Sequence, residues 1–413
     1  MSVIVCLKHV KHGLQRLEEK LRYYLYSNVF KLVKVHRNKI ILNNFYGKGY
    51  GDNPKYIADE IIKQGLPYDL VWVVKERDTT VPDRVRTVRR GSIREAYEFA
   101  TAKVIISNVK RKYPFYKKKG QYYIQTWHGC FMLKYIEAEV EKKLSARYVR
   151  ESRKDSAITD LMLSGSGLAS EVMHQSFWYS GEVYECGQPR DDIFFHCTAE
   201  EIRELKKKHR LPQDVKIAVY APTFRDGDES YPYDMIDVKA VMDGLHQKGS
   251  SEWVMVIRLH PNVACQSARF QYGEKVLDGS KYTDPQELFL MADLLITDYS
   301  SVMMDFGLMK KPVFLFVPDL EVYKRARGVR GFFEDLPFPR CRSNEELENA
   351  MNDKEVGVIL LTERFGREFP DLINEIKLQR TMPLLIEIPD RHGTGRRKDF
   401  ITSYVNEAIG LKL

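Results

Sequence analysis

The chain has 413 residues, enough for two domains of ordinary size, and 44% of them are hydrophobic. No run approaches the ~18 consecutive apolar residues that a membrane-spanning helix needs, so none is expected. Most of the formal net charge of +8 comes from residues 1–40, which hold nine Lys or Arg against two Glu. The nearly neutral remainder argues against a nucleic-acid-binding protein. Six scattered cysteines without CxxC spacing predict reduced thiols and no zinc site.

Residues 1–38 predict a basic amphipathic helix. Its apolar residues recur at spacings of three and four: Leu7, Val10, Leu14, Leu17, Leu21 and Tyr24. Two interpretations remain open, because such a helix can lie on anionic lipid or pack on its own domain. The start of the chain shows no secretory signal pattern. The lipid interpretation therefore predicts a peripheral protein at the cytoplasmic face of the cell membrane.

From residue 39 the pattern is strand (39–45), glycine-rich turn, helix (55–64) and strand (68–74). This βαβ unit indicates a parallel sheet. Further strands are predicted at residues 102–108, 122–127, 160–165 and 182–187. Residues 39–195 are therefore expected to form an N-terminal Rossmann-like domain.

A charged helix at residues 199–211 leads into a second series of short, Val- and Ile-rich strands. These are predicted at residues 216–223, 252–261, 292–301 and 311–319. We expect a second Rossmann-like domain over residues 196–385 and a helical tail over 386–413. The predicted fold class is thus α/β, with two doubly wound domains facing one another, and open sheets of this kind bind ligands beyond the carboxyl ends of their strands.

One candidate site lies in ITDYSSVMMDF (Ile296–Phe306), between a hydrophobic strand and a helical run. Asp298, Ser300 and Ser301 stand where a helix begins, and unpaired N–H groups with the helix dipole favour a phosphate there. The alternative is a simple N-cap, for which Ser and Asp are also preferred. Four polar residues in a row favour the phosphate site.

Two more strand ends carry basic residues. APTFRDG holds Thr223, Arg225 and Asp226, and RLHPN holds Arg258 and His260. Arginine binds phosphate in a bidentate manner and histidine supplies a proton or a hydrogen bond, so these loops are candidates to hold a diphosphate. The alternative is that each arginine is a surface charge paired with a nearby acid such as Asp226.

The stretch QTWHGC places His128 beside Gly129 at the end of a predicted buried strand. Glycine leaves room for a second molecule to reach the imidazole, so the stretch is either catalytic or a packed turn. Gly47, Gly49 and Gly51 are spaced evenly and do not match GxGxxG, and GxxxxGK[ST] is absent. Dinucleotide binding and P-loop hydrolysis are therefore not predicted.

Taken together, these stretches resemble the CDP-glycerol glycerophosphotransferase family, the primases and polymerases of teichoic acid and related capsule polymers. The matching pieces run in the family's order over residues 40 to 350: GKGYGDNPK, QTWHG with Leu133-Lys134, GQPRDD, YAPTFRD, RLHP, ITDYSSVMMDF and RGFFED. The resemblance implies a GT-B-like arrangement with the active site in a central cleft. It also implies transfer of glycerol phosphate, or ribitol phosphate, from a CDP-polyol to a hydroxyl of a lipid-linked glycan, with release of CMP.

Carried onto this chain, the resemblance makes His128 the general base and His260 a candidate proton donor to CMP. Residues expected to bind the donor are Arg190, Thr223, Arg225, Asp226, Arg258, Asp298, Ser300 and Ser301. No cofactor is expected, and no ligand cluster for a metal is recognised. The implied partners are CDP-glycerol or CDP-ribitol, a polyprenyl-diphosphate-linked glycan and the membrane surface.

The sequence departs from the family pattern after His128-Gly129, where Cys130, Phe131 and Met132 replace the usual Thr-Pro. Gln188, Asp191 and Phe224 also differ from the more common Tyr, Asn and Trp. Two alternatives remain: a GT-B glycosyltransferase that uses a nucleotide sugar, and a membrane-bound, non-catalytic glycan-binding protein.

Overall fold

The computed structural model describes residues 20–22, 24–75, 78–111, 117–130, 132–225, 231–247, 251–282, 284–352, 358–362 and 384–388. Residues 1–347 form one compact unit that contains two parallel sheets, and residues 348–413 form a second unit. The predicted parallel α/β fold is confirmed, and all ten predicted strands are present.

The first sheet has seven parallel strands in the order β3-β2-β1-β4-β5-β6-β7. They are β1 (His36–Asn43), β2 (Asp69–Val74), β3 (Val85–Arg89), β4 (Ala102–Ser107), β5 (Tyr122–Gln125), β6 (Leu161–Ser164) and β7 (Glu182–Glu185). Its helices are α2 (Asp52–Lys63), α3 (Ile93–Thr101), α4 (Ala146–Ile158) and α5 (Gly167–Ser176), with η3 (Glu137–Lys143) before α4. The order of the first six strands is that of a Rossmann sheet. The strand order, not the strand direction, reverses between β1 and β4, which are parallel neighbours.

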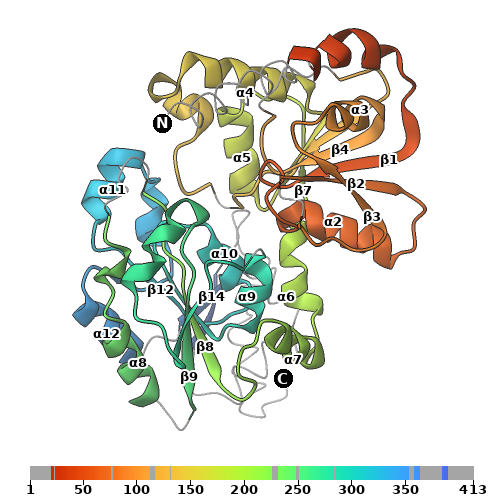
Figure 1. Ribbon diagram of the computed structural model, residues 1–413. Helices are drawn as coiled ribbons and strands as arrows, with labels where there is room; N and C mark the ends of the chain where they lie inside the picture. Colours follow the sequence, from red (N-terminus) through yellow and green to blue (C-terminus); the bar gives the residue numbers. More distant parts are fainter. Residues whose placement is uncertain are drawn as a thin grey trace, which may run out of the picture. The chain divides into compact units, whose positions relative to one another are not determined.

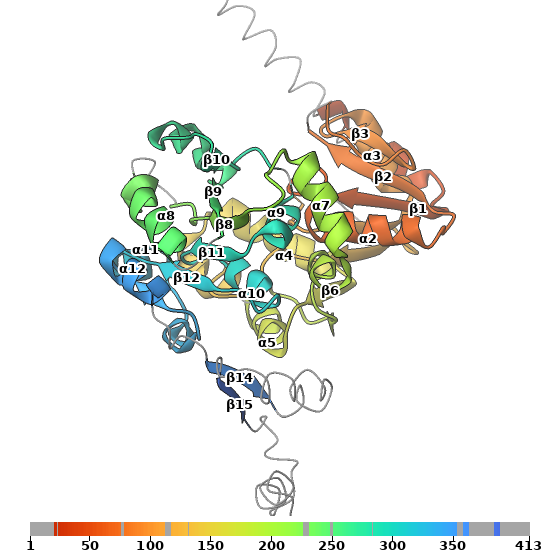
Figure 2. The same cartoon turned by 90° about the horizontal axis from the view of Figure 1, so that it is seen from below.

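Helices cover both faces of this sheet, because its strands are apolar on both sides. Ile41 packs with Phe99 of α3, whereas the flanking Ile40 and Leu42 pack with Ala58 of α2. Figures 1 and 2 show α3 and α2 on opposite faces. Alternate residues of one strand therefore serve two separate cores, as expected for a buried parallel strand.

The second sheet has the order β10-β9-β8-β11-β12-β13, which is again the Rossmann order. Its strands are β8 (Lys216–Tyr220), β9 (Trp253–Ile257), β10 (Val276–Asp278), β11 (Leu294–Thr297), β12 (Val313–Phe316) and β13 (Arg340–Cys341). Its helices are α7 (Ala199–Lys208), α8 (Val238–Gln247), α9 (Pro285–Met291), α10 (Val302–Gly307), α11 (Leu320–Arg327) and α12 (Asn344–Asn352). Short helical segments complete the chain: η4 (Pro189–Asp191), α6 (Ile193–His196), η5 (Tyr233–Met235), η6 (Pro261–Arg269) and η7 (Gly331–Asp335). Side chains of α9 and α10 pack on one face, and α8 contacts β9.

Most of the predicted N-terminal helix, residues 1–19, lies outside the described residues. The described residues up to 32 are helical and end in η1 (Leu25–Val29) and η2 (Phe30–Leu32), whereas residues 36–38 of the predicted helix belong to β1. Tyr26 is buried against the first sheet, whereas Leu21 and Tyr24 of the predicted apolar side are 46% and 59% exposed. No helix among these ranges is both long and apolar enough to span a membrane.

The C-terminal unit differs from the expected helical tail where it is described. Residues 384–388 form β15 (Leu384–Ile388), which pairs in parallel with β14 (Val358–Thr362). The sequence of this stretch, LLIEI, is rich in residues that favour strands. The remaining residues of the predicted tail, 389–413, lie outside the described part of the chain.

A steric test of the fold is available in the loop that follows β1. Gly47 has φ +85°, and a Cβ there would lie 2.8 Å from the Lys75 backbone nitrogen; Gly65 has φ +66° but nothing within 4 Å of its Cβ position. Gly65→Ala should therefore cost only the left-handed backbone term, about 1–2 kcal/mol. Gly47→Ala should cost roughly 1–3 kcal/mol more, because backbone atoms must move. Urea unfolding midpoints measure both, and equal losses would contradict the close approach.

Candidate functional site

His128 lies at the carboxyl edge of the first sheet, just after β5. Its Nδ1 lies 2.8 Å from the carbonyl oxygen of Asn108. The imidazole stacks on Trp127, with ring centroids 4.3 Å apart, and contacts Phe45 at 5.1 Å. The side chain is half-buried. Because a carbonyl oxygen only accepts, Nδ1 carries the proton and Nε2 holds the free lone pair.

The Asn108 carbonyl is itself fixed by the loops after β1 and β4, where the strand order reverses. The Asn108 side chain donates to Asn44 Oδ1 at 2.7 Å and accepts from the Phe45 backbone N–H at 2.9 Å. Asn43 Nδ2 donates to Ser107 Oγ at 3.0 Å. Ligands bind at such switch points in doubly wound sheets. His128 is held there through the Asn108 carbonyl oxygen, and side-chain amides fix the loop that carries this oxygen.

The pKa of His128 is lowered chiefly by burial, which disfavours the imidazolium. The positive charge of Arg190 lowers this pKa further, whereas Asp52, Glu137 and the hydrogen bond to Asn108 act in the opposite direction. The imidazole is therefore neutral at neutral pH and able to accept a proton at Nε2.

Strained backbone gathers around this histidine. Of the nine non-glycine residues with positive φ among the described residues, seven belong to the first half of the chain: Phe45, Tyr46, Asp52, Trp127, Met132, Glu137 and Trp178. Phe45 and Trp127 touch the His128 ring, and Asp52 and Glu137 act on its charge. Backbone strain of this kind persists where the surroundings over-determine it, which marks functional sites.

The first turn of α2, which follows the glycine-rich loop, holds the backbone just before His128 in place. Asn53 is fully buried, and its Nδ2 lies 3.4 and 3.3 Å from the carbonyl oxygens of Thr126 and Trp127. The same nitrogen donates to Gln188 Oε1 at 2.6 Å, while Asn53 Oδ1 accepts from the Arg190 backbone N–H. Three segments that the resemblance singled out therefore meet at one asparagine.

Arg190 lies at the junction between the two halves of the chain and is only 2% exposed. Its guanidinium pairs with Asp305 at 2.9 Å and with Asp52 at 3.4 Å, and donates to the His128 carbonyl oxygen at 3.0 Å. Burial and the neighbouring Asp305 raise the pKa of Asp191 to about 8, so this carboxyl is largely protonated at neutral pH. Arg190 was predicted to bind the donor. In the structure its guanidinium instead contacts Asp305, Asp52 and the His128 carbonyl oxygen.

Cys130 and Leu133 bring the His128 segment against the second half. Cys130 Sγ lies 2.7 Å from Asp305 Oδ1 and 3.6 Å from the Ser301 carbonyl oxygen. Leu133 is buried in the core of the second sheet, and Lys134 forms an antiparallel bridge with Val329. The predicted base and the predicted phosphate segment are therefore neighbours.

Arg225, predicted to bind a diphosphate, has all five N–H donors engaged by protein. Nε and Nη2 donate to the two carboxylate oxygens of Asp319 at 2.8 and 3.0 Å. Nη1 donates to Asp298 and to the Thr223 carbonyl oxygen, and Nη2 lies 3.4 Å from Tyr231 Oη. Three tyrosine rings surround it: Tyr231, Tyr299 and Tyr323. The structure thus gives Arg225 the geometry of a support for the loops after β8, β11 and β12.

Asp298 belongs to the same support, since it also accepts from the backbone N–H groups of Thr223 and Tyr299. The Thr223 hydroxyl is buried and has no hydrogen-bond partner within the described ranges. Ser300 and Ser301 follow β11 and are half-buried. Ser300 Oγ lies 3.5 Å from the Val302 backbone N–H, and the Ser301 side chain makes no capping bond to α10. The Thr223 and Ser301 hydroxyls are thus among the polar groups of the described second half that a ligand could engage.

The remaining predicted residues follow β9. His260 is exposed and stacks on Phe224, with centroids 5.4 Å apart. Arg258 is half-buried, donates to the Tyr282 carbonyl oxygen at 3.4 Å, and has a pKa lowered by burial. Asp226 lies outside the described residues. Sequence reasoning did not single out Asn108, Asp52, Asn53 or Asp305, although the last three stand inside motifs that it quoted.

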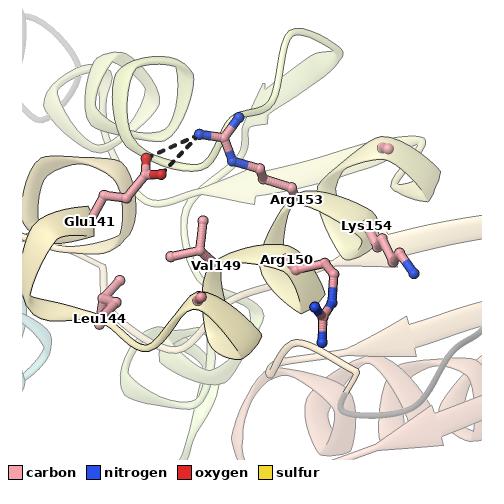
Figure 3. A pocket seen from close by; sticks show the side chains of 8 residues that line it. Glu141, Leu144, Val149, Arg150, Arg153 and Lys154 are labelled. Carbon is pink, nitrogen blue, oxygen red and sulfur yellow. Dashed lines mark hydrogen bonds and ion pairs between the residues drawn. The ribbon is translucent and has the colours of Figure 1, made fainter.

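A hollow of about 590 Å³ lies between η3 and α4. Figure 3 shows Leu144 and Val149 on its inner side and Arg153 turned to Glu141, with two bonds of 3.1 Å. Arg150 and Lys154 add positive charge at its rim. The hollow thus combines an apolar lining with cationic groups.

Comparison with known proteins gives the family. The model of the CDP-Glycerol:Poly(glycerophosphate) glycerophosphotransferase family matches residues 25–357. The chain belongs to this family. The resemblance seen in its motifs is thereby confirmed. A second model, that of the ATP synthase (F/14-kDa) subunit, matches only residues 318–405 and covers too little of the chain to show a family.

Named relatives are enzymes of teichoic acid synthesis. The chain is 32% identical to a teichoic acid poly(glycerol phosphate) polymerase from Staphylococcus epidermidis over 81% of this chain and 48% of that protein. It thus spans about half the length of that relative. It is 30% identical to a polymerase of the same name from Bacillus spizizenii over 79% of this chain and 87% of that one. Identity is also 30% to a teichoic acid glycerol-phosphate transferase from Staphylococcus aureus, over 83% and 90%.

The fold agrees with these relatives. The wall teichoic acid polymerase TagF superposes with a TM-score of 0.72 at 29% identity, covering 98% of this chain and 96% of that one. A variant of TagF soaked with CDPG gives the same TM-score.

The junction between the halves generates a stability test. Arg190→Met removes the positive charge from the buried Asp305 and Asp52, and loss of one member of a buried pair costs about 3–5 kcal/mol. Arg203→Met, which breaks an exposed pair with Glu200, should cost at most about 1 kcal/mol. Urea unfolding of both variants measures the difference. If Arg190→Met loses no more free energy of unfolding than Arg203→Met, the buried ion pair does not stabilise the junction between the two halves.

Proposed function

We propose that this chain transfers glycerol phosphate from CDP-glycerol to a hydroxyl of a lipid-linked glycan acceptor, with release of CMP, in teichoic acid or related capsule synthesis. Ribitol phosphate is the alternative donor group. The observation that carries the proposal is the fixed tautomer of His128, whose Nε2 holds the lone pair, in a segment whose Cys130 contacts the Ser301 carbonyl oxygen. Family membership and the TagF structure soaked with CDPG support the choice of donor.

In the proposed reaction the acceptor hydroxyl attacks the distal phosphorus of the donor. His128 Nε2 takes the hydroxyl proton as the new P–O bond forms, and the bond from that phosphorus to the CMP oxygen breaks. In this proposal the exposed His260 would return a proton to CMP, and the half-buried Arg258 would offset the charge of CMP. The two halves would face each other across a GT-B-like cleft.

The donor phosphates would be held by hydroxyls that the protein leaves unused. Thr223 Oγ1 has no partner in the described part of the chain, and the Ser301 hydroxyl is not spent on capping. Arg225 and Asp298 would act indirectly, by fixing the loops that carry these hydroxyls. Arg190 would likewise fix the His128 backbone through its carbonyl oxygen.

The acceptor side is supported by the hollow between η3 and α4. The apolar lipid of such an acceptor would contact Leu144 and Val149, and its diphosphate would contact Arg150 and Lys154. The exposed Leu21 and Tyr24 support a peripheral site at the cytoplasmic face of the membrane. Membrane association is part of the proposal.

The donor is tested by nucleotide release. Purified protein with a lipid-linked disaccharide is given CDP-glycerol, CDP-ribitol and UDP-sugars in turn, and CMP is expected from a CDP-polyol only. His128→Ala should lower the rate by roughly 10²–10⁴-fold, the usual contribution of a general base. His174→Ala, on the exposed side of α5, is the control and should retain the rate. Release of UDP would instead indicate a glycosyltransferase.

The pH dependence follows from the direction of the His128 shift. Because the pKa of His128 is lowered from 6.5, the basic form is complete at neutral pH, and activity should fall only as pH drops below this ordinary value. The acid limb of kcat/KM is therefore expected below pH 6.5. An acid limb above that value would contradict the role of His128 as the base.

A further inference from the structure

Lys110 and Glu137 form a buried ion pair that the reaction above does not use. Their side chains pair directly, and the residues are 7% and 4% exposed. Tyr148 Oη donates to the other Glu137 oxygen at 2.6 Å. Glu137 has φ +54°, a conformation that a non-glycine residue adopts at a cost. A strained and buried charged pair calls for a function.

An aromatic stack connects this pair to His128. The Lys110 ammonium lies 5.0 Å from the centroid of Phe177 and 5.3 Å from that of Trp178. Phe177 meets Trp127 edge-on at 4.7 Å, and Trp127 stacks on His128 at 4.3 Å. Since Phe177 is fully buried, the stack cannot shift without moving the core around it.

The backbone provides a second connection. Lys110 stands two residues after Asn108, whose carbonyl oxygen accepts the hydrogen bond from His128 Nδ1. The intervening Val109 accepts from Ser107 Oγ at 2.7 Å through its carbonyl oxygen. Anchoring the Lys110 side chain therefore also restrains the direction of the Asn108 carbonyl.

We propose that Glu137 is a positioning residue for His128, which it orients through Lys110 and whose imidazolium it stabilises by its negative charge when Nε2 takes the acceptor proton. This inference rests on the proposed function, because it assumes that His128 is the base. Glu137 exchanges no proton and forms no bond in the step. A backbone carbonyl with a nearby carboxylate thus does what a single carboxylate does in many catalytic triads.

The sign of the electrostatic effect follows from the charges that act on His128. Asp52 and Glu137 raise its pKa, and Arg190 lowers it. Lys110, which pairs with Glu137, carries the opposite charge. Glu137→Gln keeps the shape and the acceptor for Tyr148 but removes one negative charge. The pKa of His128 should therefore fall in this variant.

The test is an NMR titration of the full-length protein labelled at its ten histidines, with His128 assigned by the signal lost in His128→Gln. In Glu137→Gln the His128 titration and the acid limb of kcat/KM should move together to lower pH, and kcat should fall several-fold. Glu151→Gln, which breaks an ion pair with Arg147 on α4, is the matched control and should leave both unchanged.

If Glu137→Gln does not fold, the double variant Lys110→Met with Glu137→Gln removes both charges and keeps the site neutral. It should lower kcat several-fold, because the orientation through Lys110 is lost, whereas its His128 titration should move less than in Glu137→Gln, because the two lost charges act in opposite directions. An unchanged titration in folded Glu137→Gln, or an unchanged kcat in the folded double variant, overturns the inference, even where CMP release stands. A shifted titration without CMP release from any donor supports the coupling and refutes only the proposed function.

Discussion

The ion pair between Arg190 and Asp305 is the interaction on which the arrangement of the site depends. It joins the end of the first sheet region to the helix after β11, and both side chains are almost fully buried. A buried pair gains little net stability over apolar packing, but it is specific, since either charge alone is costly there. Cys130, Asp52 and the His128 carbonyl oxygen all bond to one of its two members. The pair therefore fixes the backbone of the His128 segment against the second half.

Around this junction the protein accepts unfavourable local conformations in return for a defined site. Trp127 and Asp52 have positive φ. The Asn53 side chain, next to Asp52, bonds to the carbonyl oxygens of Thr126 and Trp127 and so joins the two segments. Arg225 likewise contributes to a defined site, because its N–H groups donate to the surrounding loops of the protein. Arg225 looks like a ligand contact in the sequence but supports the surrounding loops. The buried Thr223 hydroxyl, which has no hydrogen-bond partner among the described residues, is the kind of group that the proposed mechanism assigns to the donor.

The fold was largely predictable, because continuous apolar runs and polar strand ends are local signals. The strand β3 (Val85–Arg89) was missed since Arg86 and Arg89 interrupt its pattern, and only the structure shows Arg86 paired with Asp69 and Glu98. The site was predictable as a set of strand ends. The hydrogen-bond partners of the site residues were not predictable. Asp319 stands 94 residues from Arg225, and no local sequence pattern distinguishes an arginine that binds phosphate from one whose N–H groups all bond within the protein. Lys110 and Glu137 were missed for the same reason.

Leu133 has a consequence for synthesis of the chain. It follows the first sheet's fifth strand, yet it is buried in the second core together with Phe333, which lies 200 residues later. At about 5–20 residues per second, a ribosome takes roughly 10–40 s to make that interval. During this time the nascent first half folds with an apolar side chain that has no core to enter. The loop carrying His128 is therefore completed last, although its own sheet is made first.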